Sequence, residues 1–189
     1  ELKSMVRSGV STDDLERAAV RRMRQAGARP AFKGYYGYPC ALCTSLNNEI
    51  VHGIPSSRRL LKEGDILKVD TGVELDGYYG DSALTIPVGQ IAPELDRLLR
   101  VTQEALALAI DQVRMGNRLG DICFAVQKHV EANGYSVVRD FVGHGIGRKL
   151  HEDPQVPNYG APGQGPRLKE GMVLAIEPMV NTGSGQACV

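Results

Sequence analysis

The spacing of hydrophobic and polar positions predicts three helices. The segment 10–27, VSTDDLERAAVRRMRQAG, has Ser11 or Thr12 as a possible N-cap, acidic residues in its first turn and a glycine at its end. A second helix is predicted over about 93–115, because a proline suits the first turn and the following residues are apolar at helical spacing. A third is predicted over about 119–133, where a glycine follows.

Strands and turns are predicted between these helices. The strand candidates are 42–51, 65–75 and 81–88, and the last two flank the turn LDGYYGD at 75–81. The stretch KGYYGYP at 33–39 is typical of a loop. Beyond the third helix, the chain continues as further strands and turns. Helices and antiparallel strands in this order predict an α+β fold.

The sequence also contains an internal repeat. LKEGDILKVD begins at residue 61, and LKEGMVLAIE begins at residue 168. The helical segment that begins at residue 6 likewise aligns with the segment that begins at residue 113, so both pairs of segments have the same separation along the chain. A common offset over two separate segments predicts two related units, each a helix followed by strands, around a pseudo-twofold axis. We expect one domain over 1–189, with halves of about 1–90 and 91–189.

Composition and charge exclude several classes of function. The chain has 189 residues, 42% of them hydrophobic and 23% charged, which is typical of a soluble globular protein with a core. Lys and Arg total 22 and Asp and Glu also total 22, so no basic field favours nucleic acid. No apolar run is long enough to span a membrane, and the first ten residues do not resemble a signal peptide. These features predict a cytoplasmic protein, monomeric by default.

The four cysteines favour reduced thiols over a disulfide framework. Cys40 and Cys43 form a C-x-x-C pair, which leaves open a redox or zinc role. The proline at position 39 and the strand-like residues that follow favour the alternative, in which both are small residues lining a core or a pocket. Cys123 and Cys188 lie far away in the sequence.

Acidic residues recur at equivalent positions of the repeat. Asp70 ends the first copy and Glu177 ends the second, so strands that meet near the axis would place both carboxylates at the centre. Two carboxylates there repel each other unless they share a proton or a cation. The turn at 75–81 is expected to bring Asp81 back beside Asp70 on the same face. Asp76 and Glu74 are expected to be turn and solvent residues.

His144 adds a nitrogen ligand to this group. It stands in GHGIG, between glycines that permit close backbone approach. A lone histidine is often a solvated or core residue, but the glycines and the central carboxylates favour a metal ligand here. Carboxylates with one imidazole suit manganese, iron, cobalt or zinc, and this number of carboxylates can bridge two ions.

Four stretches between Gly37 and Val180 carry a family resemblance: GYPCALCTSLNNEIVHGIP, VDTGVELDGYYGDSA, GHGIGRKLHEDPQVPNYG and GMVLAIEPMV. Together they resemble the bacterial type of methionine aminopeptidase, in the pita-bread superfamily that also holds prolidase and creatinase. The resemblance implies a pita-bread fold, in which two halves related by a pseudo-twofold axis form a central antiparallel sheet covered by helices.

The resemblance also implies roles for individual residues. The metal ligands would be Asp70, Asp81, His144 and Glu177. The catalytic residues would be Glu177, which also serves as a base, and two histidines that contact the scissile peptide, His52 and His151. The substrate pocket would be lined by Tyr35, Tyr38, Cys43, His52, Leu150 and His151, with Phe32 beside them. Position 150 often holds an aromatic residue in the family, so we expect a roomier pocket here.

The activity implied is metal-assisted hydrolysis that removes the N-terminal methionine from nascent proteins and peptides. The cofactor would be one or two divalent ions of cobalt, manganese, iron, zinc or nickel, and the enzyme could work transiently close to the ribosome. Two alternatives stay open: a prolidase-like X-Pro peptidase, and a non-catalytic pita-bread module that binds a protein. In the family a C-terminal glutamate bridges both ions, and this sequence ends at Val189 without it. We therefore expect a missing return strand and one weakened metal site.

Overall fold

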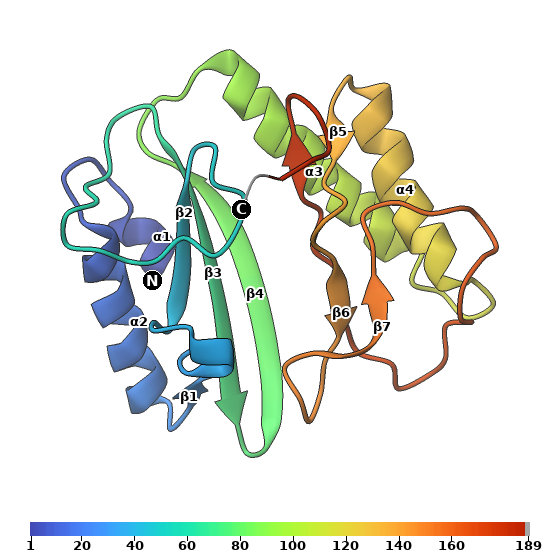
Figure 1. The fold of residues 1–189 in the computed structure, drawn as a ribbon, viewed down its shortest axis with the longest axis horizontal. Helices are drawn as coiled ribbons and strands as arrows, with labels where there is room; N and C mark the ends of the chain where they lie inside the picture. Colours follow the sequence, from blue (N-terminus) through green and yellow to red (C-terminus); the bar gives the residue numbers. More distant parts are fainter. Residues whose placement is uncertain (188–189) are drawn as a thin grey trace. The chain divides into compact units, whose positions relative to one another are not determined.

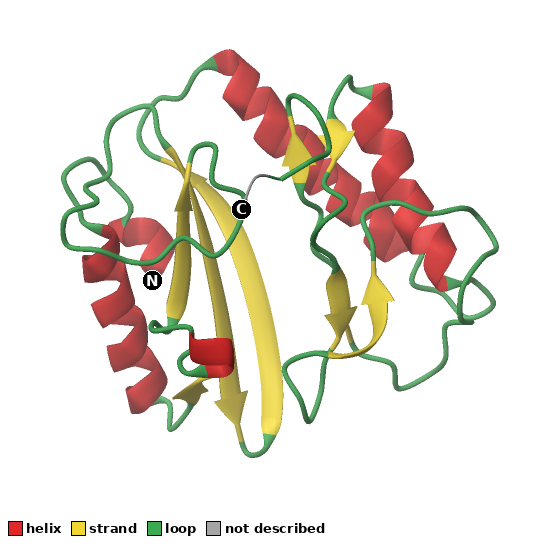
Figure 2. Ribbon diagram, viewed as in Figure 1, coloured by secondary structure: helices red, strands yellow, loops and turns green. Residues whose placement is uncertain are grey.

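The computed structural model describes residues 1–187, which form two compact units (Figure 1). The first unit contains residues 1–95 together with the short segment 147–150. The second unit contains residues 96–146 and the described chain from residue 151 onward. Both units combine helices with antiparallel strands, as the sequence predicts (Figure 2). The axis between the halves, and their union in one domain, stay predictions.

A four-stranded antiparallel sheet forms the centre of the first unit. β4 pairs with β3 along its whole length, while β2 and β1 pair with successive parts of β3. The elements of this unit are α1 (Leu2–Met5), α2 (Thr12–Gln25), β1 (Arg29–Pro30), the 3-10 turn η1 (Tyr35–Gly37), β2 (Leu42–Leu46), β3 (Ile66–Leu75) and β4 (Tyr78–Pro87).

Helix α2 begins where the sequence predicts. Ser11 is the N-cap: the Asp14 amide donates to its hydroxyl oxygen at 3.1 Å, and the Ser11 amide donates to the Asp14 carboxylate at 3.0 Å. This reciprocal pair satisfies two helix-end amides, and it holds the pKa of Asp14 down to about 2 through the hydrogen bonds from Ser11. The apolar face of α2, which includes Leu15, packs in one core with the β3 residues Leu67 and Val69.

The second unit pairs helices with two short sheets. Its elements are α3 (Pro93–Asp111, whose first turn belongs to the first unit), α4 (Leu119–Ala132), β5 (Ser136–Val137), β6 (Gly143–Gly145), β7 (Glu152–Val156), β8 (Leu174–Ala175) and β9 (Val180–Asn181). β5 pairs with β9, and β6 lies between β7 and β8. Small residues of α3, Ala105 and Ala109, form the core with Ile122, Val126 and Val130 of α4.

The internal repeat is confirmed in the secondary structure. The bounds of α4 follow those of α2 at the offset that separates the two copies of LKEG, and the bounds of β5 follow those of β1 at the same offset. The pairing repeats as well: β1 meets β3 at Arg29 and Glu74, and β5 meets β9 at Ser136 and Asn181. Glu177 of the second unit is therefore the counterpart of Asp70 on β3.

Three predicted boundaries were wrong. The strand expected to begin at residue 81 begins at Tyr78, because the hairpin turn consists only of Asp76 and Gly77. The helix expected to reach residue 115 ends at Asp111, because the turn that follows contains Gly116 at φ 97° and the amide side chain of Asn117 donates to the Gln112 carbonyl at 3.0 Å. The strand expected over 42–51 ends at Leu46, because Asn47 takes a left-handed conformation and its side-chain oxygen accepts from the Ile66 amide at 3.0 Å. Within residues 1–187, no helix is both long and apolar enough to cross a membrane.

Candidate metal centre and peptide site

Two carboxylates share one face of the β3–β4 hairpin. The turn consists of Asp76 and Gly77, both at positive φ, as a two-residue hairpin turn requires. In the resulting register Asp81 lies opposite Gly72, two residues along β3 from Asp70. Because side chains alternate along a strand, Asp70 and Asp81 are diagonal neighbours on the same face. The hairpin predicted from the sequence is confirmed, and both carboxylates are half-buried.

Glu74 is not the solvent residue that the sequence suggested. It is only 9% exposed, forms an ion pair with Arg29 of β1, and accepts a hydrogen bond from the Gly77 amide at 3.0 Å. The expectation was wrong because the partner that makes burial possible stands 45 residues earlier in the chain. Asp76 does occupy the turn, as expected. The consequence is a hairpin tip fixed from β1.

His144 is held by close backbone packing on both sides. It lies on β6 opposite Ala175 of β8, which precedes Glu177 by two residues, so this register also places a histidine and a carboxylate on one face. A Cβ atom on Gly143 would come within 2.3 Å of the Ala175 carbonyl oxygen, and one on Gly145 within 2.3 Å of the Asp153 carbonyl oxygen. The two glycines are therefore required for this approach, as predicted.

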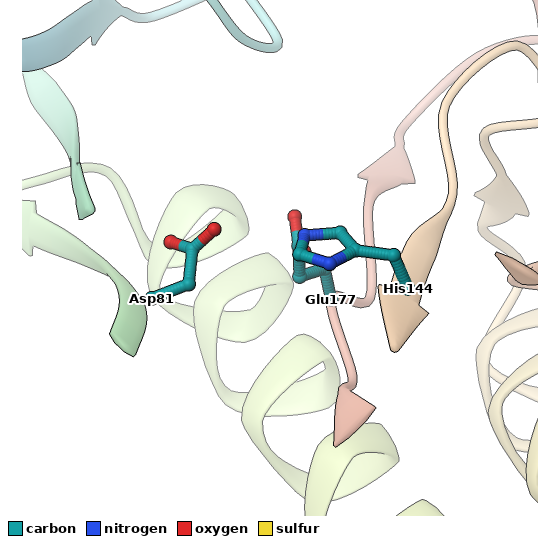
Figure 3. Close-up of side chains that lie close together, drawn as sticks. All are labelled: Asp81, His144 and Glu177. Atoms are coloured by element: carbon teal, nitrogen blue, oxygen red, sulfur yellow. The ribbon is translucent and has the colours of Figure 1, made fainter. Parts of the chain in front are cut away.

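The close contact between His144 and Glu177 is favourable only if a proton or a metal ion lies at the histidine nitrogen that faces the carboxylate. His144 Nδ1 lies 2.8 Å from the Gly145 carbonyl oxygen, which can only accept, so Nδ1 carries the proton. The other nitrogen, Nε2, lies 3.2 Å from Glu177 Oε1 (Figure 3). Within residues 1–187, that oxygen is buried and has no hydrogen-bond partner in good geometry. A lone pair facing a carboxylate oxygen is unfavourable unless a proton or a metal ion lies at Nε2.

The predicted metal ligands are divided between the units. Asp70 and Asp81 belong to the first unit, and His144 and Glu177 belong to the second. Asp81, His144 and Glu177, the side chains labelled in Figure 3, are a carboxylate, an imidazole and a carboxylate, the ligand types that divalent transition metals accept.

The predicted substrate residues of the first unit gather around β2. The Tyr38 hydroxyl lies 2.9 Å from the Leu42 carbonyl oxygen and 3.1 Å from that of Gly53, so the ring is fixed against the loop after β2. Cys43 lies directly opposite Asp70 in the β2–β3 register. His52, one residue before Gly53, is exposed and has a left-handed backbone at φ 61°.

The thiols of the C-x-x-C pair are buried rather than activated. Burial, together with a smaller effect of the neighbouring Asp70 carboxylate, raises the pKa of Cys43 to about 11, although a hydrogen bond with Tyr38 acts in the opposite direction. Burial likewise raises the pKa of Cys40. A redox cysteine needs a lowered pKa, so these environments favour the interpretation of both as lining residues. Cys123 is also buried and free, and Cys188 lies outside the described residues.

The other predicted substrate residues are placed as follows. Phe32 covers the carboxylate-bearing face of β3, since a Cβ atom on Gly72 would come within 2.5 Å of its ring. Tyr35 is half-buried, and its amide donates to the Phe32 carbonyl at 2.9 Å. Leu150 is buried in the first unit. In the second unit the ring of His151 meets that of His144 edge to face, with 4.2 Å between centroids.

Comparison with known proteins gives a consistent family. The sequence matches metallopeptidase family M24 over residues 1–188. It is 55% identical to a methionine aminopeptidase of Clostridium perfringens over 97% of this chain and 73% of that protein. It is 53% identical to methionine aminopeptidase 1 of Bacillus subtilis over 97% of this chain and 74% of that protein.

Solved structures agree with this assignment. The crystal structure of a methionine aminopeptidase from Thermotoga maritima has a TM-score of 0.98 and 46% identity, and covers 100% of this chain and 76% of that one. The prolidase of Pyrococcus horikoshii has a TM-score of 0.78 and 24% identity, covering 94% of this chain and 48% of that one, which shows the shared pita-bread fold alone. The chain therefore belongs to metallopeptidase family M24 and, within it, to the methionine aminopeptidases.

Proposed function

We propose that this metal-dependent aminopeptidase removes the N-terminal methionine from peptides and nascent proteins. The observation that carries the proposal is the contact of His144 Nε2 with Glu177 Oε1, a buried oxygen without a hydrogen-bond partner in the described chain. That arrangement suits a divalent ion. Relatives at 55% and 53% identity that bear the name methionine aminopeptidase support the substrate.

The proposed ligand set is Asp70, Asp81, His144 and Glu177. The Gly145 carbonyl fixes the proton on Nδ1 of His144 and so leaves Nε2 as the ligand atom. Metal-binding histidines commonly donate their other ring N–H to a carbonyl group in this way. The chemistry of these donors suits one or two ions of cobalt, manganese, iron, zinc or nickel. When bound, such an ion lowers the pKa of water and polarises the carbonyl group of the substrate.

The side chains of the protein would perform the remaining steps. Glu177 can orient the attacking water and accept its proton. His151 and His52 can donate hydrogen bonds to the oxyanion and to the departing amide nitrogen. His151 is exposed while its ring rests against buried His144, so it is accessible to a peptide and yet held in place.

Substrate selection would depend on the residues around β2. Tyr38 is fixed by its contacts with the two backbone carbonyls, and Cys43 presents a neutral thiol because its pKa is raised by burial. With Phe32, Tyr35 and Leu150, these side chains would form an apolar pocket for an unbranched thioether. One methylene in such a pocket changes binding by about 1–3 kcal/mol, so we expect norleucine and leucine to be cleaved more slowly rather than rejected.

The proposed setting follows from the substrate. Nascent proteins carry N-terminal methionine in the cytoplasm, so we propose that the enzyme works there, as a monomer and transiently close to the ribosome. The equal numbers of basic and acidic residues support the view that any such approach involves no strong nucleic-acid binding.

A panel of peptides tests the function and both alternatives. The purified chain, loaded with manganese, is given Met-Ala-Ser, norleucine-Ala-Ser, Leu-Ala-Ser and the X-Pro dipeptide Ala-Pro, and the released amino acids are quantified. We expect the highest kcat/KM for Met-Ala-Ser. Preferential cleavage of Ala-Pro would support a prolidase-like enzyme instead, and peptide binding without release of any amino acid would support a non-catalytic module.

A further inference from the structure

The segment 147–150 belongs to the first unit, although the residues on both sides of it in the chain belong to the second. The chain leaves the second unit after Ile146, runs through Gly147, Arg148, Lys149 and Leu150 as part of the first unit, and returns at His151. We refer to these four residues as the strap. Gly145 and Ile146 separate His144 from the strap, and His151 follows it directly. Any contact that fixes the strap therefore restricts both histidines through the backbone.

The strap is attached to the β3–β4 hairpin. The Tyr79 amide of β4 donates to the Gly147 carbonyl oxygen of the strap at 2.8 Å, rather than to a carbonyl of β3. The Arg148 guanidinium lies over the ring of Tyr78, 5.4 Å from its centroid, and donates to the Tyr78 hydroxyl at 3.3 Å. Leu150, at the end of the strap, is only 3% exposed. A hydrogen bond at Gly147, a side-chain stack at Arg148 and the burial of Leu150 thus hold three of the four strap residues.

The hairpin is a firm anchor for these contacts. Its tip is held from the opposite edge by Glu74, which accepts from Gly77 and pairs with Arg29. Tyr78 and Tyr79 begin β4, and Asp81 follows two residues later on the same strand. The element that holds the strap is therefore the element that carries a proposed metal ligand.

We propose that Arg148 is a positioning residue, which fixes the strap on Tyr78 and thereby holds His151 in the orientation that catalysis requires. This inference rests on the proposed function, because it assigns His151 a role at the scissile peptide. Arg148 and Tyr78 are both exposed, and a stack between a guanidinium and an aromatic ring at the surface is a weak interaction. Its loss should loosen the strap without unfolding the protein.

The test compares Arg148→Met with Arg97→Met. Methionine keeps the length of the side chain and removes the guanidinium. Arg97 is a matched control, because it also lies over a tyrosine ring, that of Tyr135 at 5.2 Å, and donates to a backbone carbonyl. Two quantities are measured: hydrogen exchange at the Tyr79 amide, and the separate kcat and KM for Met-Ala-Ser at saturating manganese. The melting temperature is recorded for each variant.

For Arg148→Met we expect exchange at the Tyr79 amide about fivefold faster and kcat about fivefold lower, the factors that the loss of one surface stack gives. KM should stay within about twofold, since the substrate pocket is unchanged. Arg97→Met should change neither quantity. Unchanged exchange would overturn the contact, and faster exchange with unchanged kcat would overturn the positioning role. Failure of the unmodified chain to release methionine would refute the proposed function itself, whereas the exchange measurement would still report on the strap.

Discussion

Glu177→Gln should make the protein more stable than the unmodified chain without metal, and less stable than it with metal. In the protein without metal, and at a pH high enough that Nε2 of His144 carries no proton, the Glu177 carboxylate faces the lone pair of that nitrogen at 3.2 Å, and its buried oxygen has no hydrogen-bond partner within residues 1–187. Glutamine has the same shape but carries an amide NH₂ group, which can donate to Nε2. The substitution therefore replaces an unfavourable contact with a hydrogen bond, while it removes a charged ligand.

The size of the effect can be worked out for both conditions. Without metal, one new buried hydrogen bond should raise the free energy of unfolding by about 1 kcal/mol. For a protein of 150–250 residues this corresponds to a rise of roughly 2–4 °C in melting temperature. With free metal at one hundred times its dissociation constant, the unmodified protein should gain about 2.7 kcal/mol. The variant should gain far less, because amide oxygen is a weaker ligand than carboxylate.

The assay is thermal unfolding of both proteins, first with a chelator and then with increasing manganese. We expect the variant to melt at the higher temperature in chelator and at the lower temperature in manganese. Glu170→Gln is the matched control, since Glu170 is exposed, and it should behave like the unmodified protein in both conditions. A variant that is less stable in chelator, or that manganese stabilises as much as the unmodified protein, would refute this interpretation of the contact.

Two further substitutions and one titration extend the test. Gly143→Ala should lower the free energy of unfolding, measured in urea, by about 1–3 kcal/mol, because the added Cβ meets the Ala175 carbonyl oxygen. Gly183→Ala is the control: an added Cβ there meets open space, so the free energy of unfolding should change by under about 0.5 kcal/mol. Equal effects would contradict the packing argument. Native Cys43, with a pKa of about 11, should be alkylated by iodoacetamide much more slowly at pH 8 than the unfolded chain, with the rate rising to about pH 11. Because this pKa lies above the unfolded value, the thiol favours folding below about pH 9 and loses that contribution as the pH approaches 11, so Cys43→Ala should flatten the loss of stability in that range. Half-maximal alkylation near pH 8 would contradict the burial.

Local patterns predicted much of this architecture. The capped helix behind Ser11 and the hairpin that returns Asp81 beside Asp70 depend on residues close together in the sequence, and both are found. The common offset of the repeat correctly predicted equivalent elements in both units, because a duplicated sequence repeats its caps, glycines and strand pairing. The glycines around His144 likewise signalled close backbone approach.

Features that depend on partners far away in the chain could not be predicted from the sequence. Burial of Glu74 requires Arg29, and nothing near Glu74 in the sequence indicates that partner. The strap belongs to the first unit although its neighbours on both sides belong to the second, which no local pattern could indicate. The ends of α3 and β2 were misplaced because an apolar pattern continues past the residue at which a turn begins. These are cases in which tertiary contacts override local preference.

The most direct test of the central claim is methionine release from Met-Ala-Ser as manganese is removed and returned. The carboxylate variants Asp81→Asn and Asp76→Asn are assayed beside the unmodified chain; Asp76 is exposed in the hairpin turn, where asparagine also fits. We expect release to stop in chelator, to return with manganese, to be lost in Asp81→Asn and to persist in Asp76→Asn. Release that continues in chelator, or equal release by both variants, would contradict the claim that these ligands and a divalent ion perform the hydrolysis.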